Sequence, residues 1–277
     1  MIKSILVPID DSKYSRTALD HAIEIAKLYK AKIEILSIID AKLFEDQHFH
    51  GIFAALGTKP FPDFKIKLQK TLEERAKEIL KKAVETCQVK GVTGETYLLT
   101  GILSNTITEE AEKVDVIIMG SRGESAPRKT EFLGSTVEAV VKQANKPVMI
   151  THDKHMEIKK LLVAYDRSRL SEGALSLAAD MASKGNFSIV LLTAGKKEEG
   201  KAILSKAEAY LKPYKVKVET VIKEIDPAQA IISEAKEEKC NLILMGGYGH
   251  SKFYELILGS TTEQVMRKAS CPVLLCR

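Results

Sequence analysis

Glycines and small hydroxyl side chains gather in the segment LILMGGYGHSKFYELILGST, residues 242–261. A short apolar run ends at Gly246, Gly249 follows, and Gly259 and Ser260 open a stretch with helical periodicity. Glycines let backbone N–H groups approach an anion closely, and a helix N-terminus presents unpaired amides and the positive end of its dipole. The spacing therefore predicts a cradle for a phosphate group. A tight turn followed by an ordinary helix N-cap is the alternative.

A second version of this pattern, VIIMGSRGESAPRKTEFLGST, covers residues 116–136. Ten residues separate its Gly123 from Gly134, whereas nine separate Gly249 from Gly259. The additional residue should displace one wall of the cradle by about a residue's length, so we expect this site to be the weaker one. Three basic residues of the loop could supply counter-charge to a phosphate: Arg122, Arg128 and Lys129.

The elements that must position these residues also occur twice. ILVPID, residues 5–10, matches LLVAYD, residues 161–166, and residues 133–150 share nine of eighteen positions with residues 258–275. Such self-similarity indicates a duplicated domain. We predict a first repeat at residues 1–152 and a second repeat at residues 158–277.

Each repeat alternates apolar runs with helical patterns, which favours the α/β class with a parallel sheet covered on both faces. In the second repeat the pattern predicts strands at about 159–165, 187–193, 216–222, 241–245 and 272–276. It predicts helices at about 171–183, 198–212, 227–238 and 260–269. In such sheets, ligands bind at the carboxyl ends of the strands, where the residues after the first and fourth strands would meet.

The first repeat carries about 30 additional residues, which we place near residues 41–64. Five of the eight phenylalanines fall in this insert: Phe44, Phe49, Phe53, Phe61 and Phe64. Apolar inserts of this kind usually bury themselves, so we expect a short helix and turn packed on the molecule. A lid or a subunit interface, and with it a homodimer, is the alternative.

Composition places further bounds on function. The chain has 277 residues, of which 45% are hydrophobic and 29% charged, so it is long and apolar enough to form two cores. Its net charge of +5 is not clustered in the sequence, which argues against a nucleic-acid partner. No leader or membrane-spanning run is seen, so we expect a cytoplasmic protein. The four cysteines lack paired spacing and are expected to be free, mostly buried thiols.

The spacing Gly246-x2-Gly249-x9-Gly259-Ser260, the aspartate after the first strand and the closing CPVLLCR together resemble the nucleotide-binding signature of the universal stress protein family. The resemblance occurs once in each repeat and so covers essentially the whole chain. It implies two doubly wound five-stranded parallel-sheet domains of the adenine nucleotide alpha hydrolase type. It also implies that the final strands of the two repeats pair edge to edge, which would make the chain an intramolecular pseudo-dimer.

The resemblance also implies site residues and a ligand, ATP or AMP, with Mg²⁺ as a companion of ATP. In the second repeat the phosphates would lie at Gly246, Gly249, Gly259, Ser260 and Thr261, and the adenosine at Asp166 and Ala194. In the first repeat the matching positions are Asp10, Ile38, Gly120, Gly123, Gly134 and Ser135. For Asp166, capping of the following helix is the alternative.

We predict a regulatory stress-response protein that binds nucleotide chiefly in the second repeat. The loops lack the ligand set of a dedicated phosphoryl-transfer enzyme, so we predict no catalytic residue and at most slow ATP hydrolysis. His48 with His50, and His152 with His155, could hold zinc only with ligands from elsewhere, and no metal is predicted. The alternative function is a scaffold or apolar-ligand binder that acts through the Phe-rich insert.

Overall fold

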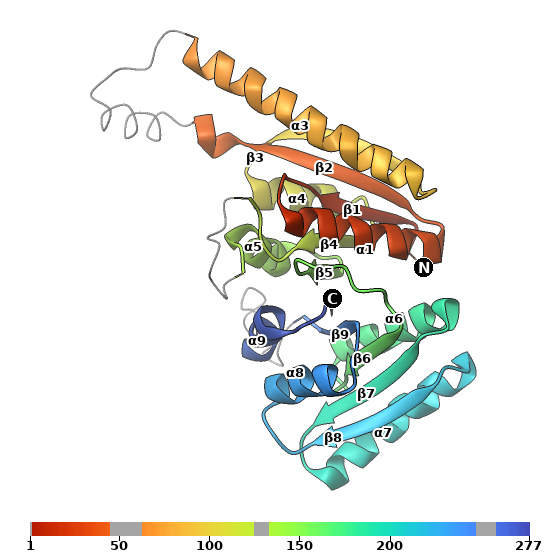
Figure 1. Cartoon of the computed structure of the whole chain (residues 1–277). Helices are drawn as coiled ribbons and strands as arrows, with labels where there is room; N and C mark the ends of the chain where they lie inside the picture. The colour runs from red at the N-terminus through yellow and green to blue at the C-terminus, as the bar shows by residue number, and fades with distance from the viewer. Residues whose placement is uncertain (1, 45–62, 125–132, 248–258) are drawn as a thin grey trace.

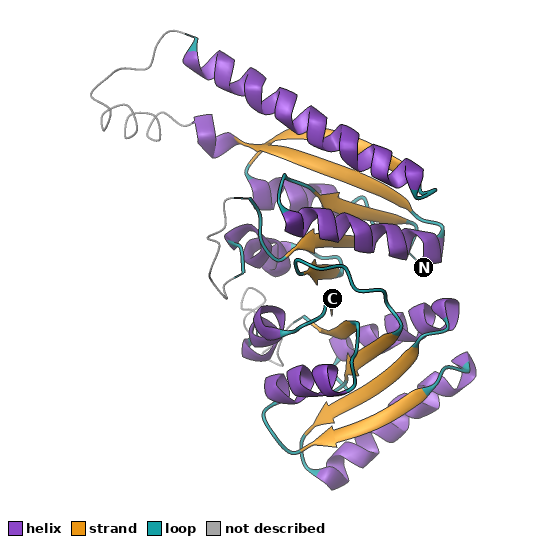
Figure 2. Ribbon diagram, viewed as in Figure 1, coloured by secondary structure: helices purple, strands orange, loops and turns teal. Residues whose placement is uncertain are grey.

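The computed structural model describes residues 2–44, 63–124, 133–247 and 259–277. In this part of the chain one continuous sheet has the strand order β3-β2-β1-β4-β5-β10-β9-β6-β7-β8. Helices cover both of its faces (Figure 1, Figure 2). Among the described residues, no helix is long and apolar enough to cross a membrane.

The first repeat supplies one half of the sheet. Its strands are β1 (Ser4–Pro8), β2 (Lys32–Asp40), β3 (Gly94–Gly101), β4 (Val116–Gly120) and β5 (Val148–Thr151). Its helices are α1 (Lys13–Tyr29), the 3₁₀ helix η1 (Ala41–Phe44), α3 (Phe64–Val89), α4 (Leu103–Ala111) and α5 (Ser135–Gln143). All neighbouring strands of this half are parallel.

The second repeat has the same plan. Its strands are β6 (Lys160–Ala164), β7 (Ser188–Ala194), β8 (Val218–Lys223), β9 (Leu242–Gly246) and β10 (Val273–Cys276). Its helices are α6 (Arg169–Gly185), α7 (Lys197–Leu211), the 3₁₀ helix η2 (Lys212–Tyr214), α8 (Pro227–Glu237) and α9 (Ser260–Lys268). Every predicted strand and helix of this repeat is present, with ends within two residues of the prediction. The predicted doubly wound α/β class is confirmed.

Two apolar cores lie on opposite faces of the sheet. Helices α1, α3, α6 and α7 cover one core, and α4, α5, α8 and α9 cover the other. Side chains of successive strand residues enter alternate cores: Ile5 belongs to the first, Leu6 to the second and Val7 to the first. A parallel strand buried on both faces requires an uninterrupted apolar run, which is why the central strands β1, β4, β6 and β9 lack polar alternation.

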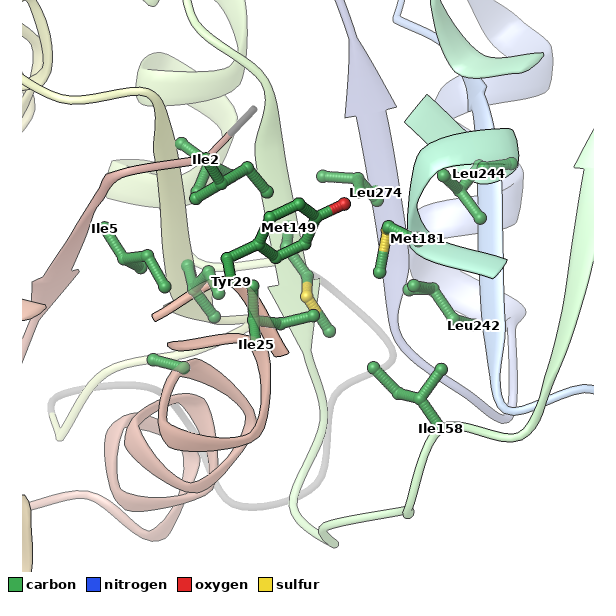
Figure 3. Packing of buried hydrophobic residues seen from close by; sticks show 14 of the residues in the cluster. Ile2, Ile5, Ile25, Tyr29, Met149, Ile158, Met181, Leu242, Leu244 and Leu274 are labelled. Atoms are coloured by element: carbon green, nitrogen blue, oxygen red, sulfur yellow. The ribbon is translucent and has the colours of Figure 1, made fainter. Parts of the chain in front are cut away.

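The two repeats join through β5 and β10, which pair antiparallel with Leu274 opposite Met149. This pairing covers the inner edge of each half, so the joined sheet ends at β3 and β8, and it confirms the predicted intramolecular pseudo-dimer. Figure 3 shows Met149, Leu274 and Ile158 between side chains of both repeats, with Tyr29 on one side and Met181 on the other. One core cluster therefore crosses the junction.

Matched caps fix the first helix of each repeat. The Ser12 hydroxyl accepts a hydrogen bond from the Ser15 N–H at the start of α1, and Ser168 does the same for Ser171 at the start of α6. The alternative that Asp166 caps α6 is therefore wrong, because the N-cap residue is Ser168, two residues later. Each aspartate instead accepts from the backbone N–H of its serine, Asp10 from Ser12 at 3.0 Å and Asp166 from Ser168 at 2.9 Å.

The two repeats differ in length because of the insert. Helix α3 has 26 residues, whereas its counterpart α7 has 15. Within the insert the structure describes η1 and the beginning of α3, and Phe49, Phe53 and Phe61 lie outside the described residues. The expected packing of the insert thus remains a prediction. At its C-terminal end the insert leads directly into the long helix α3.

Candidate functional site

A cavity of about 590 Å³ lies at the carboxyl ends of β1, β2 and β4 in the first repeat. The β1 and β4 strands are direct neighbours, so the residues that follow them flank one crevice, as the sequence predicts. All the positions predicted for the first site line this cavity: Asp10, Ile38, Gly120, Gly123, Gly134 and Ser135. Residues from four separate segments thus converge on one space.

The head of α5 forms one wall of the cavity. Gly134 is the N-cap residue, and no side chain caps the helix. Ser135, Thr136 and Val137 follow it along the wall. The first N–H groups of a helix have no partner within the helix and carry the positive end of its dipole. An anion in the cavity would satisfy these donors.

The backbone conformation at position 134 does not require a glycine. Its φ of −66° and ψ of 142° are open to any residue. A Cβ there would meet Arg122 Cα at 3.6 Å and Val137 Cγ2 at 3.7 Å, which are ordinary contacts. Since neither conformation nor packing requires glycine, the position is free to serve close approach of a ligand.

Asp10 fastens the loop that follows β4. Its Oδ2 accepts a hydrogen bond from the Glu124 N–H at 2.7 Å. A Cβ on Gly123 would lie only 2.8 Å from the same oxygen, so this glycine permits the contact. The carboxylate therefore joins the ends of β1 and β4 on the cavity wall, a role that the sequence did not reveal.

The first glycine of each motif has a packing reason. A Cβ on Gly120 would lie 2.7 Å from the backbone carbonyl carbon of Tyr14 in α1. In the second repeat a Cβ on Gly246 would lie 2.9 Å from Leu170 Cβ in α6. At these positions glycine lets the first helix of each repeat approach the end of the fourth strand.

Two arginines line the cavity. Arg122 comes from the loop after β4, and its guanidinium carbon lies 6.0 Å from the centre of the Tyr14 ring. Arg75 of α3 bonds Glu124 and, at 3.3 Å, Asp11, and these carboxylates raise the pKa of its guanidinium. Arg128 and Lys129, the other predicted counter-charges, lie outside the described residues.

Helices α3 and α4 supply an apolar wall that sequence reasoning missed. The residues concerned are Leu72, Ala76, Ile79, Leu103 and Ile107. Their helical periodicity was visible, but it indicates only a buried face and not a cavity. Arg75 was missed for the same reason, because a single basic residue on a charged helix carries no positional signal.

In the second repeat, the described site residues occupy equivalent places. Asp166 follows β6 and Ala194 ends β7, while Gly246 ends β9, the direct neighbour of β6. Gly259 is the N-cap of α9 with φ −62° and ψ 142°, nearly the geometry of Gly134, and Ser260 and Thr261 open that helix. Gly249 lies outside the described residues, so the predicted second cradle is not tested as a whole.

Comparison with known proteins gives a consistent result. A sequence model of the universal stress protein family matches residues 1–152 and 193–277. A universal stress protein from Synechocystis sp. is 30% identical over 290 residues, and the match covers 100% of both chains. One from Mycolicibacterium smegmatis is 26% identical and covers 99% of this chain and 96% of its own. The crystal structure of a universal stress protein from Archaeoglobus fulgidus matches with a TM-score of 0.80 at 24% identity, over 99% of this chain and 98% of that one.

Proposed function

Because the chain belongs to the universal stress protein family, we propose that it binds an adenine nucleotide, ATP or AMP, and acts as a regulatory stress-response protein. The observation that carries the proposal is the cavity of the first repeat, which the predicted residues of four segments line together. A volume of about 590 Å³ falls within the ~300–1,000 Å³ typical of small-molecule sites.

Each end of the cavity suits one part of a nucleotide. The uncapped head of α5 and Arg122 offer N–H donors and positive charge to phosphate. The apolar residues around Ile38 and Ile107 suit the faces of an adenine ring. In this arrangement Asp10 acts as a positioning residue, because its carboxylate holds the loop that carries Gly123.

We propose that the second repeat holds a matching site at Asp166, Ala194 and the head of α9. Its loop has the spacing of the family signature, whereas the first loop has one residue more. The expectation that the second repeat binds more tightly therefore stays a prediction. Both heads present the same N-cap geometry, at Gly134 and Gly259, which supplies a matched pair of test positions.

We assign no catalytic residue. Among the cavity carboxylates, Asp10 accepts backbone hydrogen bonds, Glu124 pairs with Arg75 and Asp40 accepts from the Lys42 N–H. A Mg²⁺ ion would therefore arrive with the phosphates of ATP and not on a preformed carboxylate set.

Isothermal titration with ATP and AMP tests the proposal. Wild type, Gly134→Val, Gly259→Val and the double variant would be compared, because valine fits the N-cap backbone at both positions but occupies ligand space. Each single variant should lose its own site, with an affinity loss of at least about tenfold there. The double variant should release no heat. Absence of heat from folded wild type would rule out nucleotide binding and favour the scaffold alternative.

A further inference from the structure

A cluster of possible metal ligands lies where the first repeat meets the linker between the repeats, residues 153–157. His21 and Glu24 are one helical turn apart on α1, and His155 comes from the segment that leads to β6. One ligand atom from each lies within 4.8 Å of the other two. The two imidazole centres are 4.5 Å apart. Residues separated by 134 positions in the sequence thus form one group.

The shorter distances in the cluster suit a shared ion. His155 Nε2 lies 3.0 Å from Glu24 Oε2, and His21 Nδ1 lies 3.8 Å from the same oxygen. Ligand atoms at Zn–N and Zn–O distances of about 2.0–2.2 Å in a tetrahedron lie roughly 3.4 Å from one another. Small side-chain rotations would therefore bring the three atoms onto a common centre.

His21 supplies an independent reason to look for a ligand. Its side chain is fully buried, and within the described part of the chain neither ring nitrogen has a hydrogen-bond partner. A buried polar group without a partner is destabilising and requires an explanation.

We propose that His21, Glu24 and His155 bind a divalent transition-metal ion, with Zn²⁺ the best match to two imidazoles and one carboxylate. Water would complete the coordination, and the half-exposed His155 leaves the ion a route from solvent. Glu24 Oε1 also accepts from the Ile158 N–H at 2.7 Å, which orients the carboxylate.

The site would have a structural consequence. Because two ligands belong to α1 and one to the linker, a bound ion would fasten the linker to the first repeat. Ile158, the first residue of the second repeat, belongs to the core that crosses the junction. Metal binding would therefore stabilise the relative placement of the repeats, independently of nucleotide binding.

Titration of tag-free, chelator-treated full-length protein with ZnCl₂ tests the proposal, with Co²⁺ absorption as a second measurement. We expect one ion per chain with imidazole coordination, and an affinity loss of at least about tenfold in His155→Ala and in Glu24→Gln. Zn²⁺ should raise the melting temperature of wild type and leave that of His155→Ala unchanged. Substitution of an exposed histidine should not unfold the protein, so the comparison stays interpretable.

The double variant His48→Ala/His50→Ala is the matched control, because it removes two histidines that are not among the proposed ligands. It should bind Zn²⁺ as tightly as wild type. The proposal is overturned if wild type binds no ion, or if the ion is lost in this control and kept in His155→Ala.

Discussion

At the scale of single residues, the walls of the candidate site are held together by hydrogen bonds that need no ligand. Asp10 is the clearest case, because its two carboxylate oxygens receive N–H groups from Ser12 and Glu124. Gly123 allows the approach. The cradle is thus held by an interaction between segments more than a hundred residues apart.

Asp10→Ala should therefore weaken both the fold and the site. Two backbone donors lose their acceptor, which should cost about 1–3 kcal/mol of unfolding free energy, and the loop should bind nucleotide less tightly. Urea denaturation and calorimetric titration would measure both effects. Asp20→Ala, at an exposed position on α1, is the control and should change neither. Equal losses in both variants would contradict the role assigned to Asp10.

The cysteines make a second prediction at this scale. All four are free and buried, as the sequence predicted. Burial raises the pKa of the Cys87 thiol to about 11 and of Cys240, Cys271 and Cys276 to about 12. Since the reactive form is the thiolate, a raised pKa means less of it at pH 8. A colorimetric thiol reagent should therefore detect none of the four cysteines in the native protein and all of them in guanidinium. Rapid labelling of any cysteine in the native protein would contradict this prediction.

At the scale of elements, helix α3 shows what the sequence could and could not predict. Apolar runs and periodicity located the strands and helices, because each run must be buried and each glycine loop must follow a strand. They could not show that the insert leads into a 26-residue helix whose Leu72, Arg75 and Ile79 line the cavity. That arrangement depends on packing between segments, which local patterns do not specify.

The same limit applies to the metal cluster. His155 was visible in the sequence as half of the pair His152 and His155, but its partners His21 and Glu24 lie on α1. Only the fold brings them together. The glycine motif, by contrast, was found from spacing alone because its parts lie on consecutive elements of one unit.

Arg75 makes a prediction for α3 as an element. It connects the helix to the loops after β1 and β4 through Asp11 and Glu124. Arg75→Ala should release this connection and speed nucleotide dissociation by up to about tenfold, while stability changes by less than about 1 kcal/mol because the pairs are exposed. Stopped-flow displacement of a fluorescent adenine nucleotide measures the rate. Lys70→Ala, which removes an exposed α3 charge that pairs with Glu74, should leave the rate unchanged. A dissociation rate unaffected by Arg75→Ala would show that the connection from α3 to these loops does not help to retain the nucleotide.

At the scale of the whole molecule, antiparallel pairing of β5 with β10 turns two five-stranded sheets into one. We propose that the repeats, residues 1–152 and 158–277, are structural domains that nonetheless unfold together, since one core cluster crosses their junction. Ligand occupancy in either repeat could then be sensed by the other through the shared strands.

Leu274→Ala tests this coupling. The side chain is 2% exposed and lies opposite Met149 in the junction, so its truncation should cost about 2–5 kcal/mol. The wild type should melt in a single calorimetric transition, and the variant should melt earlier. Val89→Ala, at a side chain 85% exposed, should change stability by less than about 0.5 kcal/mol. Two well-separated transitions in the wild type would show that the repeats unfold independently.

The most direct test of the central claim is a crystal structure of the full chain grown with saturating ATP. The phosphates should lie at the head of α5, against the N–H groups that follow Gly134, with the adenine ring near Ile38 at the carboxyl end of β2. Corresponding density is expected at the head of α9. A well-ordered structure in which both heads carry no nucleotide, or in which ATP lies away from these strand ends, would contradict the account.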